Sequence, residues 1–139
     1  MAKSLSKAQY ETLAEFRHAL RQFLGFSEAA AATAGVTPQQ HQALLAIKGF
    51  PGRDSVTVGE LAERLQLRHH SAVGLIDRLV KQRLVLRSTP PGDRRQVFIR
   101  LTAKGENILG KLSAVHREQL RRIGPEISQL LERLAGADE

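Results

Sequence analysis

Apolar and polar positions follow a helical period over most of the chain. From residue 5 to residue 33, apolar side chains recur at three- and four-residue steps, among them Leu13, Phe16, Leu20 and Phe23. This spacing lines them along one face of a helix. The face is long for a small domain, which suggests that a second subunit supplies part of its covering.

Two capping boxes mark the starts of short helices in the middle of the chain. The segments TPQQ at 37–40 and TVGE at 57–60 each place a threonine three residues before a glutamine or glutamate. In a capping box these two side chains bond each other's backbone N–H groups. The first box predicts a helix to about Lys48 and the second predicts the helix VGELAERL. The segment FPGRDS between them is predicted to be a loop.

A helix-turn-helix and a hairpin follow. Residues 66–68 form a tight connection to a further helix, HHSAVGLIDRLVKQ, and two short helices joined in this way are a helix-turn-helix. Two short apolar runs, 84–88 and 97–101, flank the turn PPGD and predict a two-stranded hairpin. Helices followed by such a hairpin make a winged helix.

The C-terminal third is predicted to hold two helices. Thr102 can cap a helix from Ala103 to about Ile123, and Gly124-Pro125 is predicted to end it before a final helix, PEISQLLERL. The fold class is therefore mostly α. It consists of a winged helix-turn-helix core with a two-stranded β wing, flanked by N- and C-terminal helices.

Positive charge is concentrated in the centre of the chain. Of a net +7, residues 53–104 hold eleven lysines and arginines against five acids, or +6, while the remaining residues hold ten against nine. A basic centre is typical of a surface that binds a polyanion, although a solvated charged surface has the same composition. The five histidines do not cluster and cysteine is absent, so we expect neither a metal nor a cofactor.

The N-terminal residues lack the apolar core of a signal peptide, and no apolar run approaches the ~20 residues of a membrane helix. We therefore expect a cytoplasmic protein with no membrane partner.

The tip of the predicted hairpin carries an acid and two arginines, Asp93, Arg94 and Arg95. A guanidinium on a short turn can enter the narrow, electronegative minor groove of a duplex. Asp93 can hold Arg95 in position beforehand, while Arg94 can reach a phosphate. The alternative is a surface turn with an incidental ion pair, worth ~0–1 kcal/mol. The position directly after a helix-turn-helix favours the DNA-binding interpretation.

The helix before the hairpin has a matching exposed face. Its first turn holds His69, His70 and Ser71, where a helix favours anions and side chains can reach base edges. Arg78 is placed to contact a phosphate, and Asp77 can pair either in the neighbourhood of Arg78 or with Lys81 at i+4.

Gly74 in the same helix costs ~1 kcal/mol of helix propensity relative to alanine. Either a close approach to a groove wall or packing against a bulky neighbour would account for it.

These segments resemble the MarR family of bacterial and archaeal transcriptional regulators. The strongest match is Asp93-x-Arg95 followed by Leu101-Thr102-x-x-Gly105, and LAERLQLRHHSAVGLIDRLVKQRLVLR resembles the family's helix-turn-helix. The resemblance covers essentially the whole chain and implies a single domain over 1–139. In it, residues 1–35 and 103–139 form dimerisation helices and residues 37–102 form the DNA-binding lobe.

The resemblance also implies a homodimer that binds a pseudo-palindromic operator in double-stranded DNA. Arg95 would enter the minor groove with the support of Asp93, while the helix from His69 would lie in the major groove. We therefore predict a sequence-specific transcriptional regulator, a repressor that a small aromatic acid releases from DNA. Arg17, His41 and Phe50 are candidates to border the pocket for that acid.

Two positions depart from the family pattern. Arg83 stands where a glycine usually ends the recognition helix, at a point where the backbone needs a left-handed conformation that arginine adopts less easily. Either the helix end differs there, or Arg83 provides one more phosphate contact. Arg68 stands where a serine usually precedes that helix, so a cap is lost and a charge that can contact DNA is gained.

Other classes of function remain as alternatives. The winged helix could bind a protein partner, or it could bind DNA without sequence preference. Binding to phosphates would fall steeply with salt, whereas an apolar protein contact would not. An enzyme is not expected, because Ser71 and His70 are adjacent on a helix and do not face each other.

Overall fold

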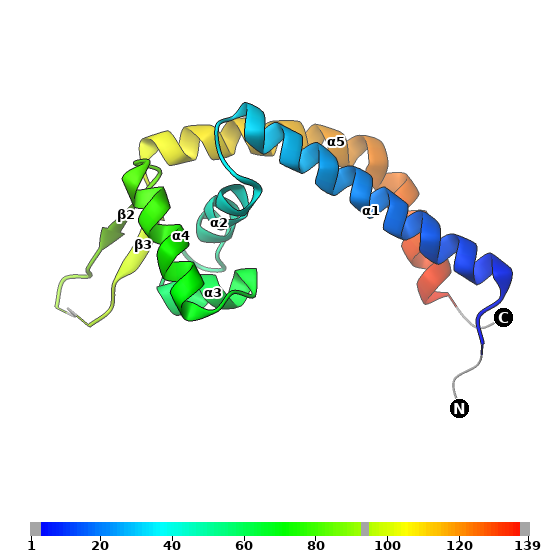
Figure 1. Cartoon of the computed structure of the whole chain (residues 1–139), viewed down its shortest axis with the longest axis horizontal. Coiled ribbons are helices and arrows are strands. Elements are labelled where there is room, and N and C mark those ends of the chain that lie inside the picture. The colour runs from blue at the N-terminus through cyan, green and yellow to red at the C-terminus, as the bar shows by residue number, and fades with distance from the viewer. Residues whose placement is uncertain (1–3, 93–94, 137–139) are drawn as a thin grey trace. The chain divides into compact units, whose positions relative to one another are not determined.

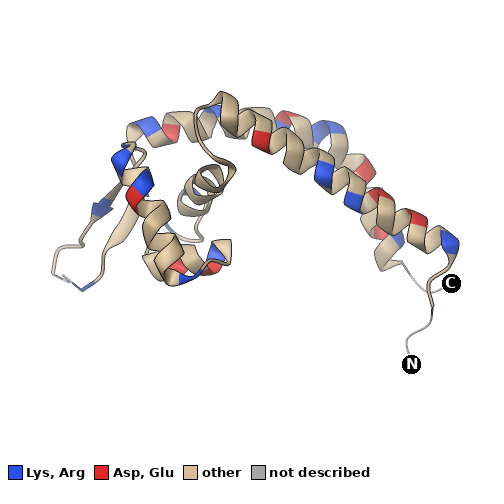
Figure 2. Cartoon of the chain, in the orientation of Figure 1, with Lys and Arg blue, Asp and Glu red and all other residues tan. Residues whose placement is uncertain are grey.

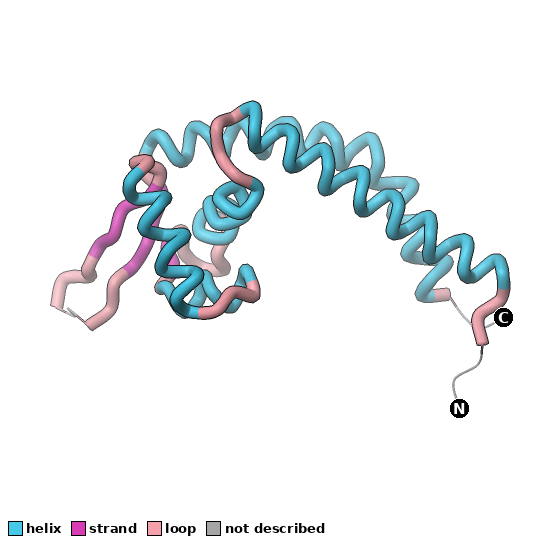
Figure 3. The backbone as a smooth tube through the Cα atoms, in the orientation of Figure 1, coloured by secondary structure: helices cyan, strands magenta, loops and turns pink. Residues whose placement is uncertain are grey.

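The computed structural model describes residues 4–92 and 95–136 and shows a mostly helical protein (Figure 1). Figure 3 shows where helices and strands alternate along the backbone. The elements in chain order are α1 (Lys7–Thr33), α2 (Pro38–Lys48), β1 (Ser55–Val56), α3 (Val58–Leu65), α4 (His69–Lys81), β2 (Val85–Ser88), β3 (Phe98–Leu101) and α5 (Ala103–Ala135).

These elements divide into two compact units, and α1 and α5 contribute residues to both. The winged lobe comprises residues 31–113. The helical unit comprises the described residues up to Ala30 and those from Ala114 onward.

The winged lobe is built on a small antiparallel sheet in the order β1-β3-β2. Val56 of β1 pairs with Ile99 of β3, and Val85 of β2 pairs with Leu101. Helices α2, α3 and α4 cover the sheet with side chains that are almost completely inaccessible to solvent, namely Leu44, Ile47, Leu61, Leu75, Ile76 and Leu79. The mostly α class and the winged helix-turn-helix are confirmed.

Strand β1 was not expected, because FPGRDS was predicted to be a loop. Two residues are too few to show an alternating pattern, and Ser55–Val56 forms a strand because β3 offers it hydrogen-bonding partners. Val56 is fully buried as a result. The sheet therefore has three strands among the described residues, of which β2 and β3 form the expected wing.

The predicted helix starts are confirmed. Thr37 and Thr57 each accept a hydrogen bond from the backbone N–H three residues on, and the side chains of Gln40 and Glu60 complete both capping boxes. Thr102 caps α5 in the same way, because its hydroxyl accepts a hydrogen bond from the N–H of Gly105 at 3.1 Å.

The predicted break at Gly124-Pro125 is wrong, because α5 runs without interruption from Ala103 to Ala135 with Pro125 inside it. A proline inside a helix removes one backbone hydrogen bond and costs ~3 kcal/mol. Ile123, Ile127 and Leu130 continue a single apolar stripe across the proline, and Leu130 is buried. Burial of that stripe offsets the lost hydrogen bond.

The helical unit pairs the first part of α1 with the last part of α5, and the two run antiparallel. His116 on α5 bonds Ser27 on α1 at 2.8 Å, and its ring meets the edges of Phe23 and Phe26. Many large apolar side chains of this unit are nevertheless exposed: Leu5, Tyr10, Leu13, Leu24, Val115, Leu120, Leu131 and Leu134. None of the described helices combines the length and apolar character needed to cross a lipid bilayer.

Candidate nucleic-acid interface

The turn between α3 and α4 depends on one left-handed residue. Gln66 ends α3 with φ 54°, and the next amide, of Leu67, donates back to the carbonyl of Ala62 at 2.8 Å. This six-to-one hydrogen bond is the signature of a Schellman helix end. It turns the chain sharply, so that α4 can begin three residues later at His69.

Helix α4 starts without a side-chain cap. Arg68 occupies the N-cap position in extended conformation and makes no side-chain hydrogen bond to the helix. The predicted loss of a cap is therefore confirmed, and the exposed guanidinium stands at the N-terminal end of α4.

Helix α4 ends on a second left-handed residue. Arg83 has φ 62°, and its N–H donates to Val80 at 2.9 Å while that of Leu84 donates to Leu79 at 2.9 Å. These two hydrogen bonds form a complete Schellman motif, in which arginine occupies the position where glycine is preferred. The left-handed conformation predicted at this position is confirmed.

Three contacts fasten the end of α4 to the rest of the winged lobe. The Gln40 amide donates to the Gln82 side chain at 3.1 Å, and Lys104 Nζ donates to the Gln82 carbonyl at 3.1 Å. Thr102 donates its hydroxyl proton to the Arg83 carbonyl at 2.6 Å. Gly105 is required nearby, because a Cβ there would overlap the Leu84 carbonyl oxygen. These contacts hold α4 in a defined orientation.

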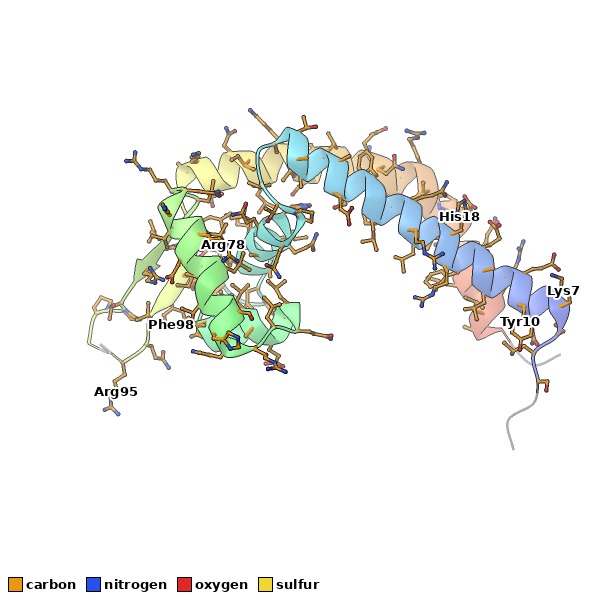
Figure 4. The ribbon with its side chains drawn as sticks, viewed as in Figure 1. Lys7, Tyr10, His18, Arg78, Arg95 and Phe98 are labelled. Atoms are coloured by element: carbon orange, nitrogen blue, oxygen red, sulfur yellow. The ribbon has the colours of Figure 1, made fainter. Side chains whose placement is uncertain are left out.

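One side of α4 is buried and the other carries the predicted site. Ala72, Leu75, Ile76 and Leu79 face the core. Among the predicted residues, Arg68, His69, His70 and Arg78 are exposed, and Ser71 and Gly74 are half-buried. In Figure 4, Arg78 is drawn along α4 and Arg95 points outward at the tip of the wing.

The wing tip is described only in part. Asp93 and Arg94 lie outside the described residues, so the predicted contact between Asp93 and Arg95 stays a prediction. Arg95 is exposed, and Gly92 before it adopts φ 90°, which a side chain would disfavour.

An ion pair joins α4 to the wing. Asp77 was predicted to pair with Lys81, but its carboxylate bonds the guanidinium of Arg87 on β2 instead. The partner lies ten residues away on a strand, where helical spacing gives no signal. The pair ties the middle of the recognition helix to the strand that leads to the wing tip.

A second cluster joins the base of the wing to α3. The Arg53 guanidinium lies over the rings of Phe50, at 4.6 Å, and Phe98, at 5.2 Å, and it pairs with Glu60. Burial opposes ionisation of Glu60. Hydrogen bonds from the Thr57 backbone and from Arg53 outweigh burial and lower the pKa of Glu60. The role of Arg53 was missed, because its partners come from three separate segments.

The three residues predicted for an effector pocket occupy different environments. Arg17 is exposed on α1, in the helical unit. His41 is buried in α2, and Phe50 is half-buried between the guanidinium groups of Arg53 and Arg64. No group of three potential metal ligands occurs within the described ranges. The effector pocket stays a prediction.

The basic centre of the sequence lies on the surface of the winged lobe. All ten described lysines and arginines between 53 and 104 are exposed. Figure 2 marks the positions of lysine and arginine along the ribbon. Asp77, Glu60 and Asp54 pair with Arg87, Arg53 and Arg100 respectively. An exposed α4 beside a basic wing defines a winged helix-turn-helix protein of the nucleic-acid-binding kind.

Comparison with known proteins finds similarity to one family over the winged lobe. A sequence model described as the MarR family matches residues 34–96, which cover most of the winged lobe. Two Bacillus subtilis proteins described as uncharacterized HTH-type transcriptional regulators are similar. YsmB is 39% identical over 66 residues, covering 48% of this chain and 45% of YsmB. YhbI is 31% identical over 87 residues, covering 60% of this chain and 56% of YhbI. The alignments thus span about half the length of these relatives.

Solved structures share the fold of the chain. AbsC of Streptomyces coelicolor, a MarR family transcriptional regulator, has a TM-score of 0.74 at 21% identity and covers 97% of this chain and 94% of its own. MepR, a transcription regulator of a Staphylococcus aureus multidrug efflux pump, has a TM-score of 0.72 at 17% identity. The match covers 94% of this chain and 95% of MepR. The chain is therefore similar to the MarR family in sequence over residues 34–96, and it shares its fold with solved members.

Proposed function

We propose that this chain is a sequence-specific DNA-binding transcriptional regulator that acts in the cytoplasm as a homodimer. The observation that carries the proposal is the exposed face of α4, whose C-terminal end is fixed and which is flanked by a wing. The described lysines and arginines between 53 and 104, in the same lobe, are all exposed. A MepR variant has been solved bound to an oligodeoxyribonucleotide, and its fold matches this chain with a TM-score of 0.68.

The candidate residues have distinct roles in this proposal. Helix α4 enters the major groove, where His69, His70 and Ser71 in its first turn face base edges. Arg68 contacts a phosphate at the helix N-terminus. Arg95 enters the minor groove from the wing tip, supported by Asp93, and Arg94 binds the backbone.

A second copy of the chain covers the helical unit. Tyr10 is 56% exposed, Leu24 49% and Leu131 47%, although each lies on a helix with an apolar stripe. Water-exposed stripes of this length are buried in oligomers. A two-fold dimer presents two α4 helices to half-sites about 34–36 Å apart, so the operator is a pseudo-palindrome.

The regulator acts as a repressor that a small aromatic acid releases. This part of the proposal rests on the family resemblance alone. Titration of the DNA complex with salicylate tests it: release of the duplex supports the effector, and an unchanged complex at millimolar salicylate opposes it.

Replacement of Arg95 tests the proposed wing contact. Arg95→Ala should weaken binding to the operator by about 1–3 kcal/mol and leave the dimer intact. Arg122→Ala is the matched control, because it removes the same charge from an exposed position in the helical unit. Fluorescence anisotropy measures affinity and sedimentation measures the oligomer. An affinity for Arg95→Ala equal to that of the control would contradict the wing assignment.

A further inference from the structure

Gly74 lies in the middle of the recognition helix without an internal reason for being glycine. A Cβ built at Gly74 meets one atom within 4 Å, Nη1 of Arg78, at the ordinary contact distance of 3.5 Å. Gly105, by contrast, leaves no room for a Cβ beside Leu84. Packing against a bulky neighbour therefore does not account for Gly74, and the ~1 kcal/mol of lost helix propensity has another cause.

The same contact locates the guanidinium of Arg78. Side chains on a helix lean toward its N-terminus and cover the turn before their own Cα. The Arg78 side chain follows this rule and lies over the bare backbone at Gly74, one turn closer to the start of α4. Its guanidinium thus lies toward the half of α4 that reaches base edges when a recognition helix enters a groove.

The charge of Arg78 is not neutralised by its acidic neighbour. Asp77, the adjacent carboxylate, pairs with Arg87 on β2. Within the described ranges Arg78 forms no ion pair, and its side chain is exposed. A planar, exposed guanidinium whose neighbouring carboxylate is engaged elsewhere is suited to bidentate binding.

We propose that Arg78 reads a guanine in the major groove of each half-site, and that Gly74 permits this by letting the helix approach closely. The inference rests on the proposed DNA-binding function and deepens it, because it names the base pair. Guanine presents O6 and N7 as two parallel acceptors, which match the two donors of one arginine. A phosphate contact, the role first predicted for Arg78, would carry no base preference.

The test begins with a random-sequence duplex library. Selection with the full-length chain defines a preferred duplex, and each G·C pair in it is then replaced by A·T. The wild type should lose roughly 10- to 100-fold in affinity at one G·C pair per half-site. Arg78→Ala should lose a similar factor on the preferred duplex and show no preference at that pair.

Two variants separate base reading from simple loss of charge. Arg78→Lys keeps the charge but loses the two parallel N–H donors of the guanidinium. It should therefore retain the salt dependence of binding and lose most of the guanine preference. Lys81→Ala removes a charge from the same helix and should affect all duplexes equally, with the guanine preference unchanged. Thermal unfolding checks that every variant is folded.

The failures are distinguishable. If a sequence is selected but Arg78→Ala weakens all duplexes by one factor and makes the salt slope shallower by about 0.9, Arg78 contacts a phosphate and the assignment is wrong. If selection enriches no sequence, the proposed function fails, and the assignment fails with it.

Discussion

Single residues with unfavourable backbone or helix preferences concentrate around α4. Gln66 and Arg83 adopt left-handed conformations, Arg68 makes no side-chain cap, and Gly74 lies in the interior of the helix. Residues that lower stability and are not required by packing commonly serve function. Other residues at these positions would therefore make α4 and its ends more stable. The proposed role of the exposed face in DNA binding accounts for the residues that are present.

Replacement of Gly74 should separate stability from binding. Gly74→Ala is expected to raise the free energy of unfolding by up to about 1 kcal/mol, because alanine favours the helix and its methyl meets only Arg78. The same change should weaken DNA binding several-fold, because the methyl adds to the surface that enters the groove. Urea unfolding and anisotropy measure the two effects, and a variant that binds as tightly as the wild type would refute the close approach.

Arg83 gives a second prediction at this scale. Arg83→Gly should stabilise the winged lobe by about 1 kcal/mol, because glycine adopts the left-handed C′ conformation without strain. The effect should appear as a higher urea midpoint with an unchanged slope. Gly92, already a glycine at φ 90°, provides the reverse comparison, since Gly92→Ala should lower the midpoint. Destabilisation by Arg83→Gly would mean that the arginine side chain contributes more than its backbone costs.

The elements of the winged lobe were largely predictable, because their signals are local. Capping boxes marked the starts of α2 and α3, and alternating apolar positions marked β2 and β3. Strand β1 and the continuity of α5 through Pro125 were not predictable in this way. The first depends on pairing with β3 and the second on packing of the stripe around Leu130, and both are tertiary effects.

The candidate site shows the same division. The sequence identified the exposed residues of α4 and Arg95, because their positions follow from helical period and from the hairpin turn. It did not identify the pairs Asp77–Arg87 and Arg53–Glu60, which link separate elements. Such pairs require the fold to bring their members together.

The Arg53–Glu60 pair predicts a pH dependence. The pKa of Glu60 is lowered in the fold, so its ionised form contributes stability that is present above the ordinary value of 4.5. That contribution is lost as pH falls through the lower folded value. Glu60→Gln should therefore destabilise the chain at pH 7 and converge with the wild type in acid.

Urea midpoints of both proteins between pH 7 and pH 3 measure this difference. Glu63→Gln, an exposed carboxylate in the same helix, is the control and should show little difference at any pH. A Glu60→Gln deficit that persists unchanged at pH 3 would show that the ionised form is not what stabilises α3.

At the scale of the whole molecule, the proposed function requires two chains. Leu13 and Leu134 line one shallow hollow between α1 and α5 and are 40% and 38% exposed. Charging both, as Leu13→Glu with Leu134→Glu, should convert a dimer to a monomer, because two carboxylates would have to be buried at the interface. Sedimentation velocity measures the change.

The monomer should also bind a palindromic duplex far more weakly, since each lobe then binds alone. Leu45→Glu is the control, because Leu45 is 47% exposed but lies on α2 in the winged lobe. A double variant that still sediments as a dimer would place the interface elsewhere.

Sequence-specific DNA binding by this chain can be tested with a single titration. The full chain is titrated against a duplex from the region upstream of its own gene and against a shuffled duplex, from 50 to 300 mM salt. A sequence-specific regulator should prefer the upstream duplex by roughly 10³-fold or more. Its log K should fall with log salt at a slope of about −5 to −9, as expected when six to ten phosphates are neutralised. Equal binding to both duplexes, or no binding at the lowest salt, would contradict sequence-specific DNA binding.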